Sequence, residues 1–468
     1  MKFHKKAPVS ESVCWKTSMS RILTGMILCA VTLNLWNLNY LLPAIGMLFS
    51  LIGFRSLKKE NKWFTGCYVL TVLQTLFFFL MLTLNTTIIQ NSFSHSSIAS
   101  ALSFVNLLFP TARALCLWMA LKTIVKEHHL EQTTGCAAAL VFWNLLMIGL
   151  ALISYQGILL SGAMIIVFII IMQNMFTLTD QMETAGYVPK PRLISLSDSG
   201  LTKIILAVFF TGCVIGYLFF ESYTMNWQTP ASFQNAKTTA IREHLLNLGF
   251  PEDILMDLSE EDILACEGAV QVVSHTSEEE VGEQDTSLFL SGVGVKLSEE
   301  ENTWKIFHHF LWNTPPKFHG TEALQLWPVY RDIPKGWNSL GELTGQLIYQ
   351  KDGETFVAPY HSLASQTVSS SNFMMGEHTN TDIFATFSMP PFGDRCSGYV
   401  SYCTQMNDND SWLFSSWCNY VHQLSWIQYP VITAMEHKIN YGWNSRTFFT
   451  AQHALQFYPE DEIPKPLS

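Results

Sequence analysis

The stretch IILAVFFTGCVIGYLFF, residues 204–220, is the last long apolar run of the 468-residue chain, and it decides the fold class. A membrane-spanning helix needs about 17 to 25 apolar residues, and this stretch meets that length. Upstream, apolar runs alternate with short polar loops, whereas the sequence after Glu221 has the mixed composition of a water-exposed domain. We therefore predict a polytopic helical membrane bundle, residues 1–221, followed by a separate region outside the membrane.

Seven apolar runs are candidate membrane spans. They lie at residues 22–36, 40–54, 63–84, 98–121, 135–154, 157–176 and 204–220. The first two are short for a span, which favours a tilted or closely packed helical hairpin. Lysines precede the first run, as in a signal peptide, but no small-x-small cleavage site follows, so we expect a retained signal anchor. The sequence thus predicts about seven transmembrane helices in contact with the lipid bilayer.

The distribution of Lys and Arg indicates the orientation of the bundle, because these residues accumulate on the cytoplasmic side. They occur in the N-terminal segment and in the loops near residues 55–62, 122–126 and 190–203. The alternate loops, at residues 37–39, 85–96 and 155–157, contain neither. We therefore expect a multi-pass protein of the cell membrane, with a cytoplasmic N-terminus and an extracytoplasmic C-terminal domain.

The region after the last span is acidic, with 12 Lys and Arg against 31 Asp and Glu from residue 221 onward. This charge argues against nucleic acid or anionic lipid as its ligand. The same region contains four cysteines, and a disulfide among the last three or free thiols are both compatible with their spacing. The four are Cys266, Cys396, Cys403 and Cys418.

Residues 228–268 are predicted to form a helical neck. Ile241 and Leu245 share one helix face, and Gly249 is placed to end that helix. Ser259 with Asp262 three residues later is a capping-box pattern at the start of a second helix. The apolar stripe either docks another protein or is buried within the chain, and we favour burial within the chain.

Residues 269–468 are predicted to form a mainly β extracytoplasmic domain, an antiparallel sandwich or a jelly-roll-like fold. Short stretches with period-two alternation are separated by Gly, Pro, Asn and Ser turns. Asp352-Gly353 suits the type I′ turn of a hairpin. The acidic run at residues 274–287 is expected to be a solvated loop.

Two features of the apolar runs have functional alternatives. Gly212 and Gly216 form a GxxxG pattern, which permits close helix approach either in a homodimer or against a neighbouring span. Arg113 is an ionisable residue at membrane depth. Its side chain either snorkels to the cytoplasmic interface, which we favour, or marks a solute pathway.

Catalytic and metal-binding signals are weak in this sequence. It contains no HExxH, G-x-S-x-G or CxxC pattern and no Gly-rich phosphate loop, so we assign no catalytic residue and no cofactor. Asp408 and Asp410 lie in the oxygen-rich sequence NDND, where calcium binding and a simple polar turn are the alternatives. His308 and His309 would point to opposite faces of a strand, which disfavours one shared metal site.

Aromatic residues are abundant near the C-terminus, where residues 304–468 contain eight of the fourteen Trp residues. Exposed rings can stack on sugars while neighbouring Asn, Gln and Asp bind hydroxyls, but core packing is the alternative for most of them. We expect Trp412, Trp417 and Tyr420 to contribute to a ligand-binding surface.

These observations lead to a functional hypothesis. The chain is expected to be a non-catalytic binding or sensing protein whose ligand is an envelope glycan or a surface protein. An envelope enzyme acting on glycan or on a lipid-linked substrate, and an accessory subunit of a transporter, are the alternatives.

Overall fold

The chain forms two compact units, Met1–Leu218 and Phe219–Ser468. The structure is a computed structural model. It describes residues 9–459 except 31–36, 95, 154, 156, 195, 231–234, 281–285, 299–301, 313, 317, 319, 331–335, 373–375, 392, 407–412 and 443.

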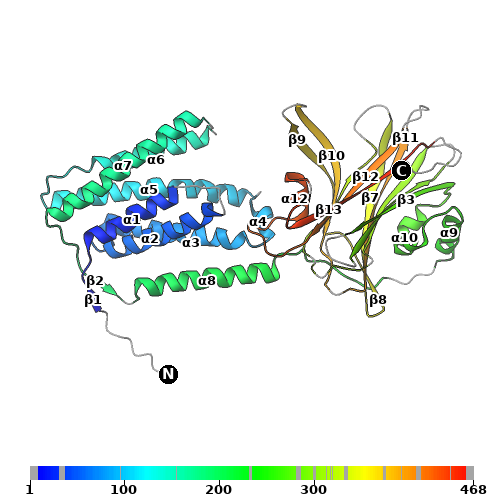
Figure 1. Cartoon of the computed structure of the whole chain (residues 1–468), viewed down its shortest axis with the longest axis horizontal. Coiled ribbons are helices and arrows are strands. Elements are labelled where there is room, and N and C mark those ends of the chain that lie inside the picture. The colour runs from blue at the N-terminus through cyan, green and yellow to red at the C-terminus, as the bar shows by residue number, and fades with distance from the viewer. Residues whose placement is uncertain are drawn as a thin grey trace, which may run out of the picture. The chain divides into compact units, whose positions relative to one another are not determined.

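The first unit is a bundle of long helices (Figure 1). Its elements are β1 (Val9–Glu11), α1 (Trp15–Ala30), α2 (Leu38–Leu57), α3 (Lys62–Leu84), α4 (Ile89–Ser94), α5 (Ser97–Glu127), α6 (Gly135–Leu152), α7 (Ile158–Thr184), β2 (Arg192–Ile194) and α8 (Asp198–Phe219). Within the described residues, six helices are long and apolar enough to cross a membrane: α2, α3, α5, α6, α7 and α8. The remaining predicted span, the run at residues 22–36, corresponds to α1, which has 16 described residues. Residues 31–36 of that run lie outside the described part.

Helices α1 and α2 form the closely packed hairpin that the two short runs suggested. A Cβ atom at Gly25 would lie 2.6 Å from the carbonyl oxygen of Gly46, and one at Gly53 would lie 2.8 Å from that of Ser18. The absence of side chains at these glycines lets the two backbones approach each other, as small residues do between membrane helices.

The second unit contains two antiparallel β-sheets. Its strands are β3 (Gln271–Glu280), β4 (Ser287–Lys296), β5 (Thr303–Trp312), β6 (Glu322–Trp327), β7 (Trp337–Lys351), β8 (Glu354–Ala358), β9 (Ser362–Asn372), β10 (Gly376–Phe387), β11 (Arg395–Met406), β12 (Phe414–Gln423) and β13 (Phe448–Phe457). One sheet has the order β3-β4-β5-β11-β7-β8 and the other β13-β12-β6-β10-β9. Apolar residues of both sheets, among them Trp304, Phe310 and Tyr420, share one core.

The type I′ turn between β7 and β8 is confirmed, because Asp352 and Gly353 have φ angles of 53° and 80°. The acidic run behaves differently from the expected loop. Residues 274–280 continue β3, and Glu278 pairs with Phe289 of β4. The neighbouring strand thus extends regular structure into a stretch that like-charge repulsion alone would leave irregular.

Three helices pack on the six-stranded sheet: α9 (Ala236–Asn247), α10 (Glu252–Asp257) and α11 (Glu260–Leu264). Their apolar residues, including Leu245 and Ile263, share a core with Val293 and Phe307 of the sheet. The helix cap expected at Ser259 is confirmed, because its hydroxyl accepts a hydrogen bond from the backbone N–H of Asp262 at 3.1 Å.

Buried ion pairs join these helices to the same sheet. Asp262 lies 2.9 Å from the Nζ atom of Lys305, and both side chains are almost fully buried. Asp257 accepts two hydrogen bonds from Arg395, at 2.9 and 3.0 Å, and lies 2.8 Å from the Nε2 atom of His309. Polar groups that are buried in this way need such partners, because an unpaired charge in the interior is costly.

A fourth helix, α12 (Ala434–Asn440), packs on the five-stranded sheet, on the opposite side of the strands from α9 and α10 (Figure 1). Ala434 forms a small apolar cluster with Ala323, Val421 and Phe448. This helix covers one part of the outer surface of the five-stranded sheet.

Candidate functional site

Two tryptophans lie side by side on the outer surface of the five-stranded sheet. In β12, Phe414, Cys418 and Tyr420 belong to the shared core, so the alternate residues, among them Trp417, point away from it. Trp417 pairs in register with Trp327 of β6, and their ring centroids are 6.4 Å apart. Trp327 is 40% exposed and Trp417 is half-buried.

A row of polar side chains crosses four strands next to these rings. Gln452 of β13 donates to Asn419 of β12 at 2.9 Å, and Asn419 donates to Gln325 of β6 at 3.1 Å. Gln325 in turn donates to Asp382 of β10 at 2.6 Å. We call Trp327, Trp417 and this row of four polar residues the aromatic–amide face.

The carboxylate at the end of the row has an unusual environment. Burial raises the pKa of Asp382 above its usual range, although hydrogen bonds from Gln325 and Trp327 oppose the rise. Lys438 of α12 favours the charged form as well. Asn419, Gln325 and Asp382 are themselves buried and bonded to one another. The surface that a ligand can contact therefore consists of the two tryptophan rings and the half-buried Gln452.

The predicted ligand-binding residues are placed differently from one another. Trp417 belongs to the aromatic–amide face. Tyr420 is fully buried, and its hydroxyl accepts a hydrogen bond from the indole of Trp312 at 2.9 Å. Its assignment to a ligand-binding surface is therefore wrong, because a residue three positions from Trp417 on a strand points to the opposite side. Trp412, Asp408 and Asp410 lie outside the described residues.

The sequence reasoning missed five members of this face: Trp327, Gln325, Asp382, Asn419 and Gln452. A signal was present in EALQLW, residues 322–327, where Gln325 interrupts a strand that is otherwise mostly apolar. Trp304, Trp312 and Trp337 are buried, as core packing requires. Among the described residues, no group of three or more His, Cys, Asp or Glu is arranged to hold a metal ion, and His308 and His309 do contact opposite sides of β5.

The cysteines of the second unit are free thiols. Cys266, Cys396 and Cys418 are buried, and Cys403 is half-buried. Burial raises the pKa of the Cys396 and Cys418 thiols to about 12, which keeps them protonated and unreactive at neutral pH.

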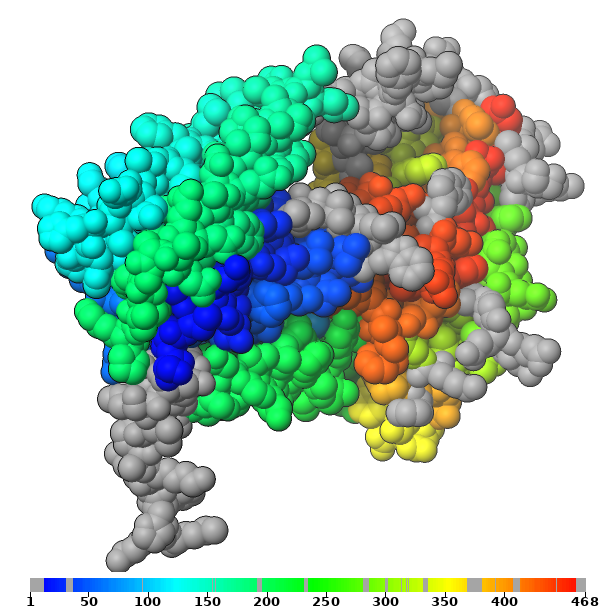
Figure 2. All heavy atoms as spheres, turned by 60° about the vertical axis from the view of Figure 1, so that its left-hand side comes forward, coloured from blue at the N-terminus to red at the C-terminus, as the bar shows by residue number. Residues whose placement is uncertain are grey.

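In the membrane bundle, the glycines of α8 face another helix of the same chain. A Cβ atom at Gly212 would lie 2.9 Å from the Thr83 side chain of α3, and one at Gly216 would lie 3.2 Å from the Cβ atom of Thr86. Gly216 is the one buried residue along the fully described α8. The helix lies at the outer side of the bundle (Figure 2). Of the two alternatives for this motif, the structure has packing against a neighbouring span.

Arg113 does not snorkel. It lies near the middle of α5, is 3% exposed, and its Nη1 atom donates to the side-chain oxygen of Gln74 in α3 at 2.8 Å. Its Nε atom has no hydrogen-bond partner among the described residues. Snorkelling is predicted if Arg113 lies near the end of its span, but α5 continues to Glu127, so Arg113 lies near its middle and is buried.

Comparison with known proteins yields little. No family model matches the chain, and no curated protein matches it significantly in sequence. Among solved structures, a protein described as a pore-forming protein is 9% identical, with a TM-score of 0.18, over 42% of this chain and 96% of that chain. The KRT10-binding region domain of the pneumococcal serine-rich repeat protein PsrP is 11% identical, with a TM-score of 0.18, over 32% of this chain and 86% of that chain.

The NetB toxin of Clostridium perfringens, in its membrane-inserted form, is 7% identical, with a TM-score of 0.11, over 40% of this chain and 95% of the toxin chain. Likenesses this weak establish neither a shared fold nor a shared function.

Proposed function

We propose that this chain is a membrane-anchored binding protein whose β domain recognises a glycan on the extracytoplasmic side. The observation that carries the proposal is the aromatic–amide face, where Trp327 and Trp417 lie beside a row of amides. Sugar rings combine apolar faces with many hydroxyl groups. The two tryptophan rings offer aromatic surface, and the half-buried Gln452 is the amide of the row that a hydroxyl group can reach. The placement outside the cell rests on the alternation of basic and uncharged loops.

Binding is favoured over hydrolysis at this face. Most glycoside hydrolases use two carboxyl groups about 5 to 10 Å apart. Asp382 is the one carboxylate in the aromatic–amide face as the structure describes it, and it accepts a hydrogen bond from Gln325. An enzyme of the envelope is therefore the weaker alternative.

An accessory role in transport has less support. Solute pathways through a bundle present ionisable groups to a polar cavity. Arg113 is buried and bound to Gln74, and it does not line the cavity between α1, α6 and α7.

The proposal is tested with the full chain in lipid nanodiscs, sedimented with envelope glycan from which protein and lipid have been removed. We expect retention of the chain, and about ten-fold weaker retention of Trp417→Ala or Trp327→Ala, because one stacked aromatic contributes roughly 0.5–1.5 kcal/mol beyond its buried area. Trp426→Ala is the matched control, since Trp426 is 49% exposed but lies outside this face. Capture by intact envelope without any retention on stripped glycan would instead identify a protein or lipid ligand.

A further inference from the structure

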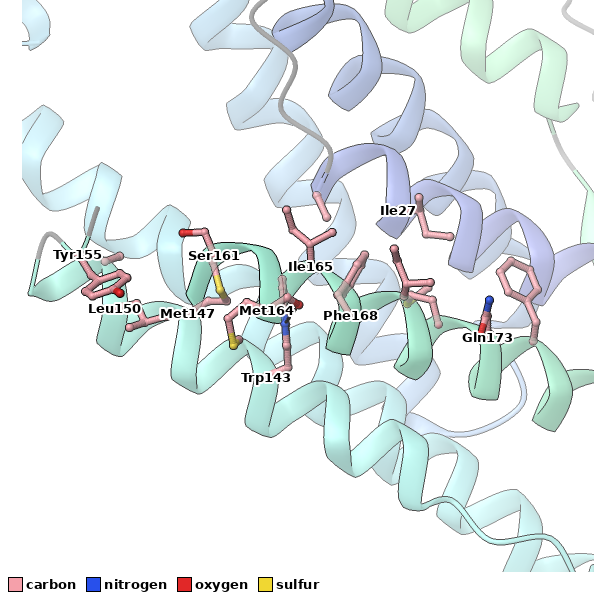
Figure 3. Close-up of a pocket in the computed structure, with 15 residues that line it drawn as sticks. Ile27, Trp143, Met147, Leu150, Tyr155, Ser161, Met164, Ile165, Phe168 and Gln173 are labelled. Carbon is pink, nitrogen blue, oxygen red and sulfur yellow. Dashed lines mark hydrogen bonds between the residues drawn. The ribbon is translucent and has the colours of Figure 1, made fainter. Parts of the chain in front are cut away.

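A long crevice lies in the bundle between α1, α6 and α7. Its volume is about 680 Å³. Figure 3 shows its lining side chains in a line along α6 and α7, from Tyr155 and Ser161 at one end to Gln173 at the other, with Ile27 of α1 alongside. The lining residues of α7 run from Ser161 to Phe176, which corresponds to about 22 Å along a helix that rises 1.5 Å per residue.

The walls of the crevice select an apolar occupant. The indole N–H of Trp143 donates to the carbonyl oxygen of Met164 at 3.1 Å. The hydroxyl of Ser161 donates to the carbonyl oxygen of Gly157 at 2.9 Å. These donors are therefore already used within the chain. Most of the remaining wall is aliphatic, aromatic or methionine side chain, and methionine adapts to irregular shapes.

The length of the crevice suits an extended hydrocarbon chain. One leaflet contributes about 15 Å to a hydrocarbon core of about 30 Å, so an extended lipid chain fits within the length available.

The crevice is continuous with the surface that faces the bilayer. Phe142 of α6 and Ile165 and Ile166 of α7 are 70%, 60% and 60% exposed on these apolar helices, and Ile165 also lines the crevice. Lipid therefore reaches the opening without crossing a polar barrier.

We propose that the crevice holds one acyl chain of a membrane lipid, with the polar end of that lipid next to Tyr155. Tyr155 lies in the loop between α6 and α7, and tyrosine favours the membrane–water interface. Gln173, at the other end, lies well before the end of α7 at Thr184, within the helix. The acyl chain of the lipid therefore enters the crevice from the Tyr155 end.

Photolabelling of the full chain in nanodiscs tests this proposal. The probe is a phosphatidylcholine with a diazirine on its acyl chain, and labelled peptides are mapped by mass spectrometry. We expect label on Met164, Phe168 and Met172 in preference to Ile166 and Ile170 of the same helix, which do not line the crevice. Label distributed evenly around α7 would overturn the proposal, because bulk lipid touches every exposed position equally.

Two matched substitutions complete the experiment. Ala151→Trp places a large ring in the crevice and should reduce labelling of Phe168 at least about five-fold. Ala163→Trp adds the same ring at an exposed position of α7 outside the crevice and should leave labelling unchanged. Equal labelling of Phe168 in both variants would contradict a lipid occupant. Equal melting temperatures of the two variants show that both are folded.

Discussion

At the scale of single residues, Arg113 is a charge enclosed by membrane helices with a neutral amide as its partner. Its hydrogen bond to Gln74 offsets part of the cost of removing a guanidinium from water. The two residues therefore contribute unequally to stability, because loss of the amide leaves a buried charge, whereas loss of the charge leaves only a buried amide.

We expect Gln74→Leu to destabilise the bundle by about 1.5–3 kcal/mol, the range for hydrogen bonds to charged groups. Arg113→Met should cost less, and the double variant should recover most of the loss caused by Gln74→Leu. Melting temperatures in one detergent give the comparison. A double variant less stable than Gln74→Leu alone would show that Arg113 stabilises the bundle through other contacts.

At the scale of elements, helices α10 and α11 are held to their sheet by ionised carboxylates. Burial alone would raise the pKa of Asp262, but the charge of Lys305 and hydrogen bonds from Thr344 and Tyr399 lower it below its usual value. For Asp257, burial is likewise outweighed by the hydrogen bond with His309 and the charge of Arg395, so its pKa is also lowered. Both carboxylates therefore bind protons less readily in the folded chain than in the unfolded chain.

This lowering fixes the sign of an expected pH dependence. The stabilisation is complete above the unfolded-state pKa, about 3.9 for Asp, and is lost as the pH falls through the lower folded-state values. We expect the second unit to lose thermal stability in acid below about pH 4. Asp262→Asn should cost about 3–5 kcal/mol at neutral pH, because it leaves Lys305 buried without a counter-charge, and should flatten the acid dependence. Differential scanning calorimetry of the unaltered protein and of Asp262→Asn across this pH range is the measurement. Melting temperatures that fall in parallel with pH in the two proteins would contradict this account.

Local chemistry explains which elements could be predicted from sequence. The Asp352-Gly353 turn and the Ser259 cap depend on a few adjacent residues, and both were predictable. The aromatic–amide face was not, because Gln325, Asp382 and Asn419 come from strands that are distant in the chain. Trp417 and Tyr420 also show that an aromatic segment does not reveal which side of a strand faces the core.

At the scale of the whole molecule, the distribution of basic residues leads to a test of orientation. We expect a tag after Ser468 to be labelled on intact cells and a tag before Met1 to be labelled only after permeabilisation, because loops rich in Lys and Arg favour the cytoplasmic side. An antibody against each tag provides the measurement. Labelling of the N-terminal tag alone on intact cells would reverse the orientation and place the aromatic–amide face in the cytoplasm.

The packing of α9 to α11 on the six-stranded sheet determines where a soluble fragment of this protein can begin. A fragment starting at residue 269 would uncover Val293 and Phe307 and would leave Lys305 without Asp262. Exposed apolar surface and an uncompensated charge favour aggregation and proteolysis over a stable fold. A fragment that begins before α9 retains the cover of the sheet, so crystallisation and binding studies of the β domain should include these three helices.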